Sequence, residues 1–285
     1  MKLGYIGYGE AAYYMSAGLS KQGVEQYACS RTFSYKGKPE EVGVKRCASY
    51  EELFSICDTV FAMTPNVAAV PTVEKVLPYL HEGIVYVDLS SASPKLMEQA
   101  AALVKPTGAL FVDATMLDSL PKYGCRVKIA TSGDGAEELS RRLAGLDMRV
   151  DMVSDRAGAA GAIKLLRSVY TKTHLGFALE MLEGATHYGV ADYVMQGLAE
   201  TMDAKTFIEG MNERLSGGVL HAARRADELA MGAEMLDDAG LDSSVSTAAV
   251  QKLRKLGEMK LKDKLGDYRP TDWKDAIRCI HEYKD

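Results

Sequence analysis

The chain has 285 residues, of which 47% are hydrophobic and 26% are charged, as in an ordinary globular protein with room for two domains. Its formal net charge of -5 argues against a general nucleic-acid binder, and no stretch has the roughly 20 apolar residues that a membrane helix needs. Met1 directly precedes an apolar run, and the five cysteines are scattered without a CxxC pair. We therefore expect a cytoplasmic protein with reduced thiols, no signal peptide and no metal site.

The first part of the chain alternates short β-forming runs with helical stretches up to about residue 155, which is typical of βαβ units on a parallel sheet. The expected strands span residues 3–6, 26–29, 59–63, 84–89, 110–113 and 127–130. Ser49 opens a capping box with Glu52, and Ser93 precedes a proline at the first helical position. Asp134 can cap a helix over residues 137–143.

The second part differs, because it lacks proline from residue 157 to about residue 187 and its apolar residues recur at helical spacing. We expect one long helix there, followed by further helices. The later helices are expected to break near Gly217-Gly218, Gly240 and Arg269-Pro270. The sequence therefore predicts an α/β domain over residues 1–156 and an all-helical domain over residues 157–285, entered through the long helix.

A GxGxxA motif stands between the first expected strand and the first helix, as Gly7-Tyr8-Gly9-Glu10-Ala11-Ala12. Gly7 permits a tight turn, Gly9 lets the backbone approach a pyrophosphate, and the small Ala12 lets the helix pack on the sheet. The helix N-terminus, with its free N–H groups and dipole, favours this anion. We therefore expect a Rossmann domain whose dinucleotide contacts these six residues and Met63, Thr64 and Pro65.

The residues after the second expected strand favour NADP over NAD. An NAD enzyme usually has an acid there for the ribose 2′-hydroxyl. This chain instead has Ser30-Arg31-Thr32, with Lys36 and Lys38 nearby and no acid before Glu40. Arg31 can bind a 2′-phosphate with two hydrogen bonds, while the flanking hydroxyls donate further ones. An ordinary solvated surface arginine is the alternative.

A helix start poor in side chains opens the second part, as Gly158-Ala159-Ala160-Gly161-Ala162-Ile163-Lys164. A flat ring or a substrate could lie against this bare backbone. Lys164 lies on the same helix face as Ser168, one turn on. A lysine in a cleft beside a nicotinamide cation has a lowered pKa, which suits general acid–base chemistry near neutrality. The residues alone leave open that Lys164 is a surface lysine on an alanine-rich helix.

These motifs resemble, in order and over nearly the whole chain, those of the β-hydroxyacid dehydrogenase superfamily. Its members include 3-hydroxyisobutyrate dehydrogenase, tartronate semialdehyde reductase and 6-phosphogluconate dehydrogenase. Ser30-Arg31-Thr32 is similar to the Asn-Arg-Thr of NADP-dependent members. Asp88-Leu89-Ser90-Ser91-Ala92-Ser93-Pro94 is similar to the family's Asp-x-Ser-Thr-x-x-Pro, which lies by the nicotinamide and the substrate. Gly158-x-x-Gly161-x-x-Lys164 matches the segment that carries the catalytic lysine.

The resemblance implies site residues, and the chain departs from the family pattern at some of them. The implied catalytic residues are Lys164 and Ser168, and the implied substrate-binding residues are Ser90, Ser91, Thr115, Met116 and Gly161. Ser168 replaces the usual asparagine, and Thr171 stands where decarboxylating members have a glutamate. The loop usually written Asp-Ala-Pro-Val-Ser-Gly-Gly reads Asp113-Ala114-Thr115-Met116-Leu117-Asp118-Ser119, so N–H groups for a substrate carboxylate are absent or moved.

A late Lys-Asp pair of the family is also missing. His221-Ala222-Ala223-Arg224-Arg225-Ala226-Asp227-Glu228 stands there and resembles a poorly characterised branch with an Arg-Arg-x-x-Glu helix. Either Arg224 or Arg225 replaces the missing cation, or these residues form a solvated helix face.

The sequence thus predicts an NADP-dependent oxidoreductase that transfers a hydride between nicotinamide and a small hydroxy acid or related carbonyl compound. Lys164 gives or takes the hydroxyl proton, Ser168 holds the lysine or the substrate, and Ser91 orients the substrate. Met116 and Leu117 favour a small or apolar hydroxy acid over 6-phosphogluconate. The alternatives are an imine reductase, whose relatives commonly lack the lysine, and an inactive NADP(H)-binding sensor. The long helix calls for a partner surface, and the resemblance implies a homodimer.

Overall fold

The computed structural model describes residues 1–33 and 39–283, and the chain divides into two compact units, Met1–Ser168 and Val169–Asp285. The division falls inside the long helix α7 (Ala159–His187), whose first turns therefore belong to the first unit. The sequence placed the whole of this helix in the second domain, and that boundary stays a prediction.

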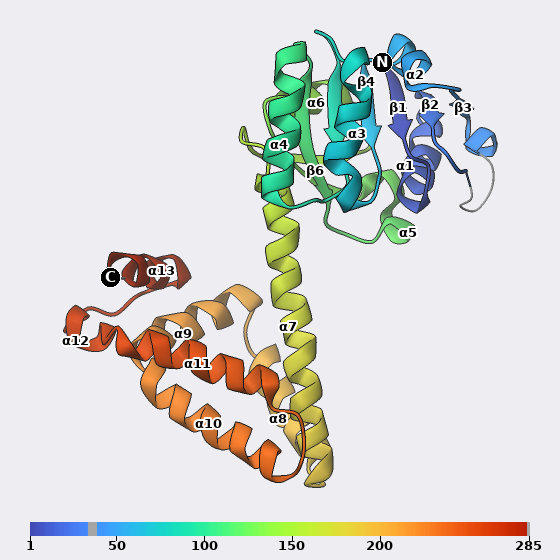
Figure 1. The fold of residues 1–285 in the computed structure, drawn as a ribbon. Helices are drawn as coiled ribbons and strands as arrows, with labels where there is room; N and C mark the ends of the chain where they lie inside the picture. The colour runs from blue at the N-terminus through green and yellow to red at the C-terminus, as the bar shows by residue number, and fades with distance from the viewer. Residues whose placement is uncertain (34–38, 284–285) are drawn as a thin grey trace. The chain divides into compact units, whose positions relative to one another are not determined.

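One sheet of eight strands lies at the centre of the first unit, in the order β3-β2-β1-β4-β5-β6-β7-β8 (Figure 1). The strands are β1 (Lys2–Ile6), β2 (Glu25–Cys29), β3 (Val44–Arg46), β4 (Thr59–Ala62), β5 (Val85–Asp88), β6 (Leu110–Met116), β7 (Lys128–Ser132) and β8 (Arg149–Ser154). Neighbouring strands are parallel except β6 and β7. The predicted α/β class is confirmed. The edge strands β3 and β8 were not expected, and the strand expected over residues 110–113 continues to Met116.

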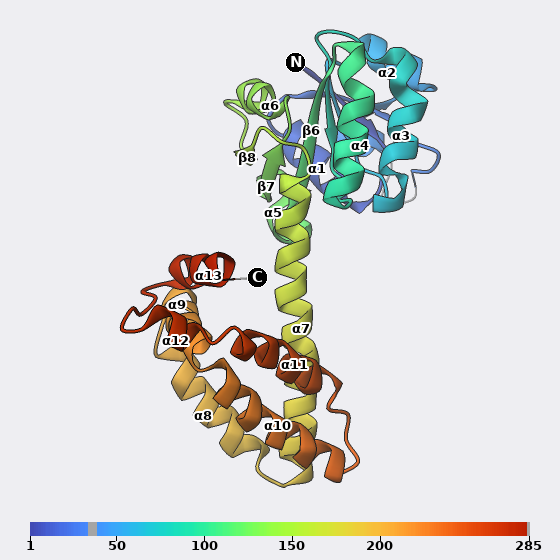
Figure 2. The same cartoon turned by 60° about the vertical axis from the view of Figure 1, so that its left-hand side comes forward.

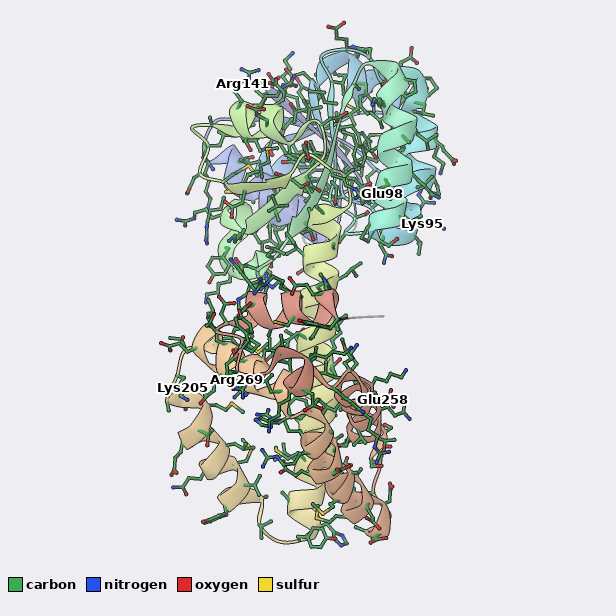
Figure 3. All side chains as sticks on the ribbon, turned by 90° about the vertical axis from the view of Figure 1, so that its left-hand side faces the viewer. Lys95, Glu98, Arg141, Lys205, Glu258 and Arg269 are labelled. Carbon is green, nitrogen blue, oxygen red and sulfur yellow. The ribbon has the colours of Figure 1, made fainter. Side chains whose placement is uncertain are left out.

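Helices cover both faces of this sheet (Figures 1 and 2). They are α1 (Glu10–Ser20), α2 (Tyr50–Ile56), α3 (Ala69–Val76), α4 (Pro94–Val104), α5 (Leu120–Tyr123) and α6 (Ala136–Leu143). Leu53, Val73 and Met97 of α2, α3 and α4 lie in one buried cluster, whereas Met15 of α1 and Leu139 of α6 lie in the other. Lys95 and Glu98 are on the exposed side of α4, as Figure 3 shows, so this helix is amphipathic as a sheet-covering helix must be.

Two of the three expected helix starts are confirmed. Ser49 accepts a hydrogen bond from the Glu52 N–H at 3.1 Å, and α4 begins with Pro94 after the N-cap Ser93. The expectation for Asp134 was wrong. Gly135 caps α6, and the Asp134 carboxylate instead accepts the N–H of Phe111 at 2.8 Å, which ties this turn to strand β6.

The second unit contains the rest of α7 and the helices α8 (Ala191–Asp203), α9 (Phe207–Leu220), α10 (Ala222–Asp238), α11 (Ser244–Glu258), α12 (Leu261–Leu265) and α13 (Trp273–Glu282). The expected breaks near Gly240 and Arg269-Pro270 are confirmed, and the break expected near Gly217-Gly218 falls three residues later, at His221 between α9 and α10. Buried Glu180 accepts the N–H groups of Val245 and Ser246 and thereby fixes the start of α11 against α7.

No helix within the described residues is long and apolar enough to cross a membrane. The five cysteines are free thiols. Within residues 1–33 and 39–283, no three His, Cys, Asp or Glu side chains are grouped so that they could hold a metal ion.

Candidate active site

The GxGxxA loop has the geometry of a dinucleotide cradle. Gly7 has a φ of +82°, and a Cβ on it would lie 2.8 Å from the Met63 carbonyl oxygen, so only glycine fits there. Gly9 is the N-cap of α1 and nothing lies within 4 Å of the position of its missing Cβ, so a ligand can approach the backbone closely. Ala12 is completely buried against the sheet, in the packing role that the motif gives its third small residue.

A cavity of about 380 Å³ opens beside this loop, a volume in the range of small-molecule and cofactor sites. It is lined by Ile6, Gly7, Tyr8, Gly9, Cys29, Ser30, Arg31, Thr32, Tyr50, Met63, Thr64, Pro65, Ala68, Pro71, Thr72 and Lys75. The cavity brings together the expected cofactor residues except Glu10, Ala11 and Ala12. The buried hydroxyl oxygen of Thr64 has no hydrogen-bond partner, which is what a site for a polar ligand group requires.

Tyr8 and Ser30 join the two loops that line this cavity. The Tyr8 side chain is buried and its hydroxyl is hydrogen-bonded to Ser16 at 2.7 Å, so only its backbone can face a ligand. The Tyr8 N–H donates to the Ser30 hydroxyl oxygen at 3.1 Å, and this hydroxyl donates to the Thr32 carbonyl oxygen at 2.6 Å. Ser30 therefore holds the loop after β2 in place, and its proton is already engaged.

Two cations line the cavity, Arg31 and Lys75, and both are exposed. Sequence reasoning found Arg31 but missed Lys75, which lies in the last turn of α3. The only sequence signal for it is helical spacing, since Ala68, Pro71 and Lys75 lie on one side of this segment. The expected contributors Lys36 and Lys38 lie outside the described residues.

A second polar cluster surrounds Lys164. Its ammonium donates a hydrogen bond to the Ser91 hydroxyl oxygen at 3.0 Å, and the Ser91 and Thr115 hydroxyl oxygens are 3.0 Å apart. Ser91 has a φ of 57°, a strained conformation for a residue with a side chain. Thr115 is completely buried, so it acts on the site through Ser91 and not by touching a substrate. Lys164 is half-buried, and this burial lowers the pKa of its ammonium.

The other expected residues of this cluster are Ser168, Met116 and Gly161, and their surroundings support a direct role in the site less strongly. Ser168 is partly exposed on α7, and the hydrogen bond of the Lys164 ammonium goes to Ser91 and not to Ser168. Met116 is partly exposed at the end of β6. The bare face of α7 does not receive a flat ring at Gly161, because a Cβ there would lie 2.7 Å from the Ala92 carbonyl oxygen. Gly161 is therefore required by the packing of α7 on the Ser91–Pro94 loop.

The loop that carries Ser91 is held by a buried aspartate. Asp88 ends β5, and its carboxylate accepts the Ser90 N–H at 2.8 Å while its other oxygen has no partner. Burial raises the pKa of Asp88 to about 6, the nearby Asp113 carboxylate adds to the rise, and the hydrogen bonds from Ser90 oppose it. Sequence reasoning placed Asp88 in a motif but assigned it no role.

Comparison with known families identifies both parts of the chain. Residues 2–117 match the NAD binding domain of 6-phosphogluconate dehydrogenase, and residues 185–256 match a domain of unknown function, DUF1932. An uncharacterised 28.5 kDa protein of Methanothermus fervidus is 28% identical over 80% of this chain and 88% of its own length. The 2-(hydroxymethyl)glutarate dehydrogenase of Eubacterium barkeri is 26% identical over 76% of this chain and 77% of its own.

Solved structures agree with this assignment. A conserved protein of unknown function, described as structurally similar to 3-hydroxyacid dehydrogenases, is 27% identical and covers 90% of this chain and 97% of its own, with a TM-score of 0.63. An imine reductase of Streptomyces aurantiacus shares the fold, with a TM-score of 0.73, 20% identity and coverage of 98% of this chain and 99% of its own. The fold and the cradle define an oxidoreductase that uses a nicotinamide dinucleotide. The chain is similar to members of the β-hydroxyacid dehydrogenase superfamily, and residues 2–117 match the NAD binding domain found there.

The raised pKa of Asp88 predicts a pH-dependent stability difference between wild type and Asp88→Asn. Between pH 3.8 and about 6 the unfolded chain has lost this proton and the folded chain keeps it, so wild-type stability falls as pH rises through this window. The asparagine still accepts the Ser90 N–H but does not titrate. Relative to wild type, the variant should gain about 3 kcal/mol of unfolding free energy between pH 3.5 and pH 7.5. Urea unfolding at a series of pH values measures this, and a difference that does not change with pH would contradict it.

Proposed function

We propose that this protein is an NADP-dependent dehydrogenase or reductase that acts on a small hydroxy acid or related carbonyl compound, with Lys164 as general acid and base. The observation that supports this most is the hydrogen bond from the half-buried Lys164 ammonium to Ser91. Ser91 belongs to the segment that in this superfamily lies by the nicotinamide and the substrate. The Eubacterium barkeri relative is named for a hydroxy acid, which supports the substrate class.

The proton chemistry needs only residues of the first unit. The nicotinamide, when bound, gives or accepts the hydride. In the oxidising direction, the neutral amine of Lys164 accepts the hydroxyl proton of the substrate at Nζ, and in the reducing direction the ammonium returns it. Burial lowers the pKa of Lys164, which raises the fraction of neutral amine at a given pH and so favours its use as a base. Ser91, held by Thr115, fixes the amine and offers a hydroxyl to the substrate oxygen.

Replacing Lys164 by methionine should abolish turnover without unfolding the protein. Removal of a positioned acid–base group typically costs on the order of 10²–10⁴ in rate, whereas a partly exposed lysine typically changes stability by less than about 0.5 kcal/mol. NADPH oxidation with a panel of short 2-oxo and semialdehyde acids gives the rate, and thermal melting and NADPH titration are the controls. Lys172→Met, an exposed lysine of the same helix, serves as the matched variant. Turnover of Lys164→Met within about threefold of wild type would remove the assignment.

The preference for NADP rests on the cations of the cavity. Arg31 and Lys75 both line it, and no acidic side chain is present among its described lining residues. An arginine fork on a phosphate is typically worth roughly 1.5–3 kcal/mol. Ser30 positions this loop through its bonds to Tyr8 and Thr32, so Arg31 is held near the cavity by the fold.

We expect Arg31→Ala to weaken NADPH binding by about tenfold or more and to leave NADH binding nearly unchanged, because NADH lacks the 2′-phosphate. Lys75→Ala should have the same sign and a smaller effect, since a lysine binds phosphate as a point charge. The control is Arg141→Ala, which removes an exposed arginine of α6 (Figure 3) that pairs with Glu138 and does not line the cavity. Calorimetric titration with both cofactors measures this, and equal or tighter NADH binding to wild type would contradict the preference.

An imine reductase is the second candidate, supported by the shared fold over 98% of this chain. Imine reductase relatives commonly lack this lysine, so the presence of Lys164 favours the carbonyl reaction. NADPH oxidation with a cyclic imine in place of the oxo acids separates the two. A protein that binds NADPH and oxidises it with neither class would be a sensor.

We also propose that the protein is a cytoplasmic homodimer built by the helical unit. This unit exposes large apolar side chains, among them Val169 (63% exposed), Leu175 (60%), Phe207 (61%) and Ile208 (63%). Apolar surface of this kind on several helices is typical of a subunit interface.

Sedimentation at micromolar concentration should therefore give twice the chain mass of 31.0 kDa. Val169→Glu and Phe207→Glu should each shift the equilibrium toward monomer, since a buried unpaired charge costs several kcal/mol. Glu258→Ala, at the end of α11, is the control for a surface charge change. A wild-type monomer under these conditions would refute the dimer.

A further inference from the structure

We propose that Asp113 is a positioning residue for this reaction, because its buried carboxylate fixes the start of α7 and thereby the place of the Lys164 amine. The inference rests on the proposed function of Lys164. Asp113 itself is completely buried and touches neither the cavity nor Lys164 directly.

One oxygen of Asp113 collects three hydrogen bonds. Its Oδ2 accepts the Ser132 hydroxyl, the Gly158 N–H and the Gly161 N–H, each at 3.0 Å. The Ser132 oxygen in turn accepts the Ala160 N–H at 3.0 Å. Two side chains from strands β6 and β7 thus satisfy the N–H groups at the start of α7. A carboxylate is the natural partner for them, because the helix dipole favours negative charge at this end.

The helix start has no freedom to settle elsewhere. A Cβ at Gly158 would lie 3.0 Å from backbone atoms of Pro94, and one at Gly161 would lie 2.7 Å from the Ala92 carbonyl oxygen. The first turn of α7 is therefore held between the sheet and the loop that carries Ser91. Lys164 follows Gly161 by about one turn, so a shift or rotation of this turn moves its amine directly.

Strand β6 supports both partners of the hydrogen bond that matters for the chemistry. Asp113 and Thr115 are two residues apart on this strand and lie on the same face. Asp113 holds the helix of Lys164, and Thr115 holds Ser91. The distance between the Lys164 amine and the Ser91 hydroxyl is thus set by one rigid strand. A misplacement of about 1 Å in such an arrangement can cost about 10²-fold in rate.

The test compares Asp113→Asn and Ser132→Ala with the control Asp134→Asn. Asparagine keeps an acceptor at the site but removes the charge, and Ser132→Ala removes the Ala160 acceptor and one donor to Asp113 without changing charge. Asp134 also holds β6, through the Phe111 N–H, but does not contact α7, so it controls for general loosening of the strand.

The main readout needs no substrate. Competitive acetylation of the whole protein with acetic anhydride over a pH series, read by mass spectrometry of the Lys164 peptide, reports the pKa of this amine. Because burial lowers the pKa of Lys164, an amine that leaves its half-buried place should titrate closer to an ordinary lysine. We expect this rise in Ser132→Ala and in Asp113→Asn, and no change in Asp134→Asn.

Turnover in the oxo-acid panel is the second readout. We expect kcat to fall roughly 10- to 100-fold in Asp113→Asn and less in Ser132→Ala, with the KM for NADPH within about twofold of wild type. The double variant should lose less than the product of the two single losses, since both act on one helix start. If Asp113→Asn fails to fold, Ser132→Ala decides the matter alone.

Two results keep this inference separate from the proposed function. If the Lys164 titration and kcat stay at wild-type values in Ser132→Ala and in any folded Asp113→Asn, with only the melting temperature lowered, Asp113 is merely structural and the inference is overturned. If Lys164→Met remains active, the proposed function fails, whatever the titration shows.

Discussion

The structure of the first unit depends on which groups satisfy the free N–H groups at the starts of two helices, α1 and α7. The N–H groups at the start of α1 follow Gly9 and receive no side-chain cap, which leaves them to an anionic ligand. The N–H groups at the start of α7 are taken by Asp113 and Ser132. One helix start is thus open to the proposed cofactor, and the other is closed by the protein itself, on the helix that carries the proposed catalytic Lys164.

Buried carboxylates are costly, and their location explains why the fold keeps two of them. Asp88 at the end of β5 is in register with Asp113 in the middle of β6, and burial raises the pKa of both carboxyl groups. Each retains one oxygen without a partner. Asp88 shapes the turn that leads to the strained Ser91, and Asp113 holds the first turn of α7. Burying these two carboxylates lowers the stability of the fold. In return they fix the turn before Ser91 and the first turn of α7, and the separation of these two segments sets the Lys164–Ser91 hydrogen bond.

Much of the first unit could be predicted from local sequence, because its signals are local. The GxGxxA turn, the apolar central strands and the long proline-free helix each follow from residues close together in the chain. The edge strands β3 and β8 could not be predicted in the same way, since they are short or half-exposed and carry charged residues on their open side.

The predictions that were wrong or missing also depend on residues that are distant in the sequence. Asp134 has the right type and place for a helix cap, but the N–H of distant Phe111 competes for its carboxylate. Gly217-Gly218 lies in the last turn of α9, and the helix ends at Leu220, so the two glycines mark this break only to within a few residues. Lys75 and Ser132 could not be found as site residues, because only the assembled sheet and its helices bring them to the cavity and to α7.

The departure of the loop after Asp113 from the family pattern also has a physical meaning. Strand β6 runs to Met116 and pairs antiparallel with β7, and the Leu117 N–H donates to the Lys128 carbonyl oxygen at 2.8 Å. This N–H is therefore used by the sheet and is not offered to a substrate carboxylate. The proposed proton chemistry depends on Asp88 and Asp113, whereas the family resemblance implies that substrate contacts come from the loop that follows β6. Because the residues that position Lys164 are separate from this loop, the sequence of the loop can change to suit another substrate while the position of Lys164 stays fixed.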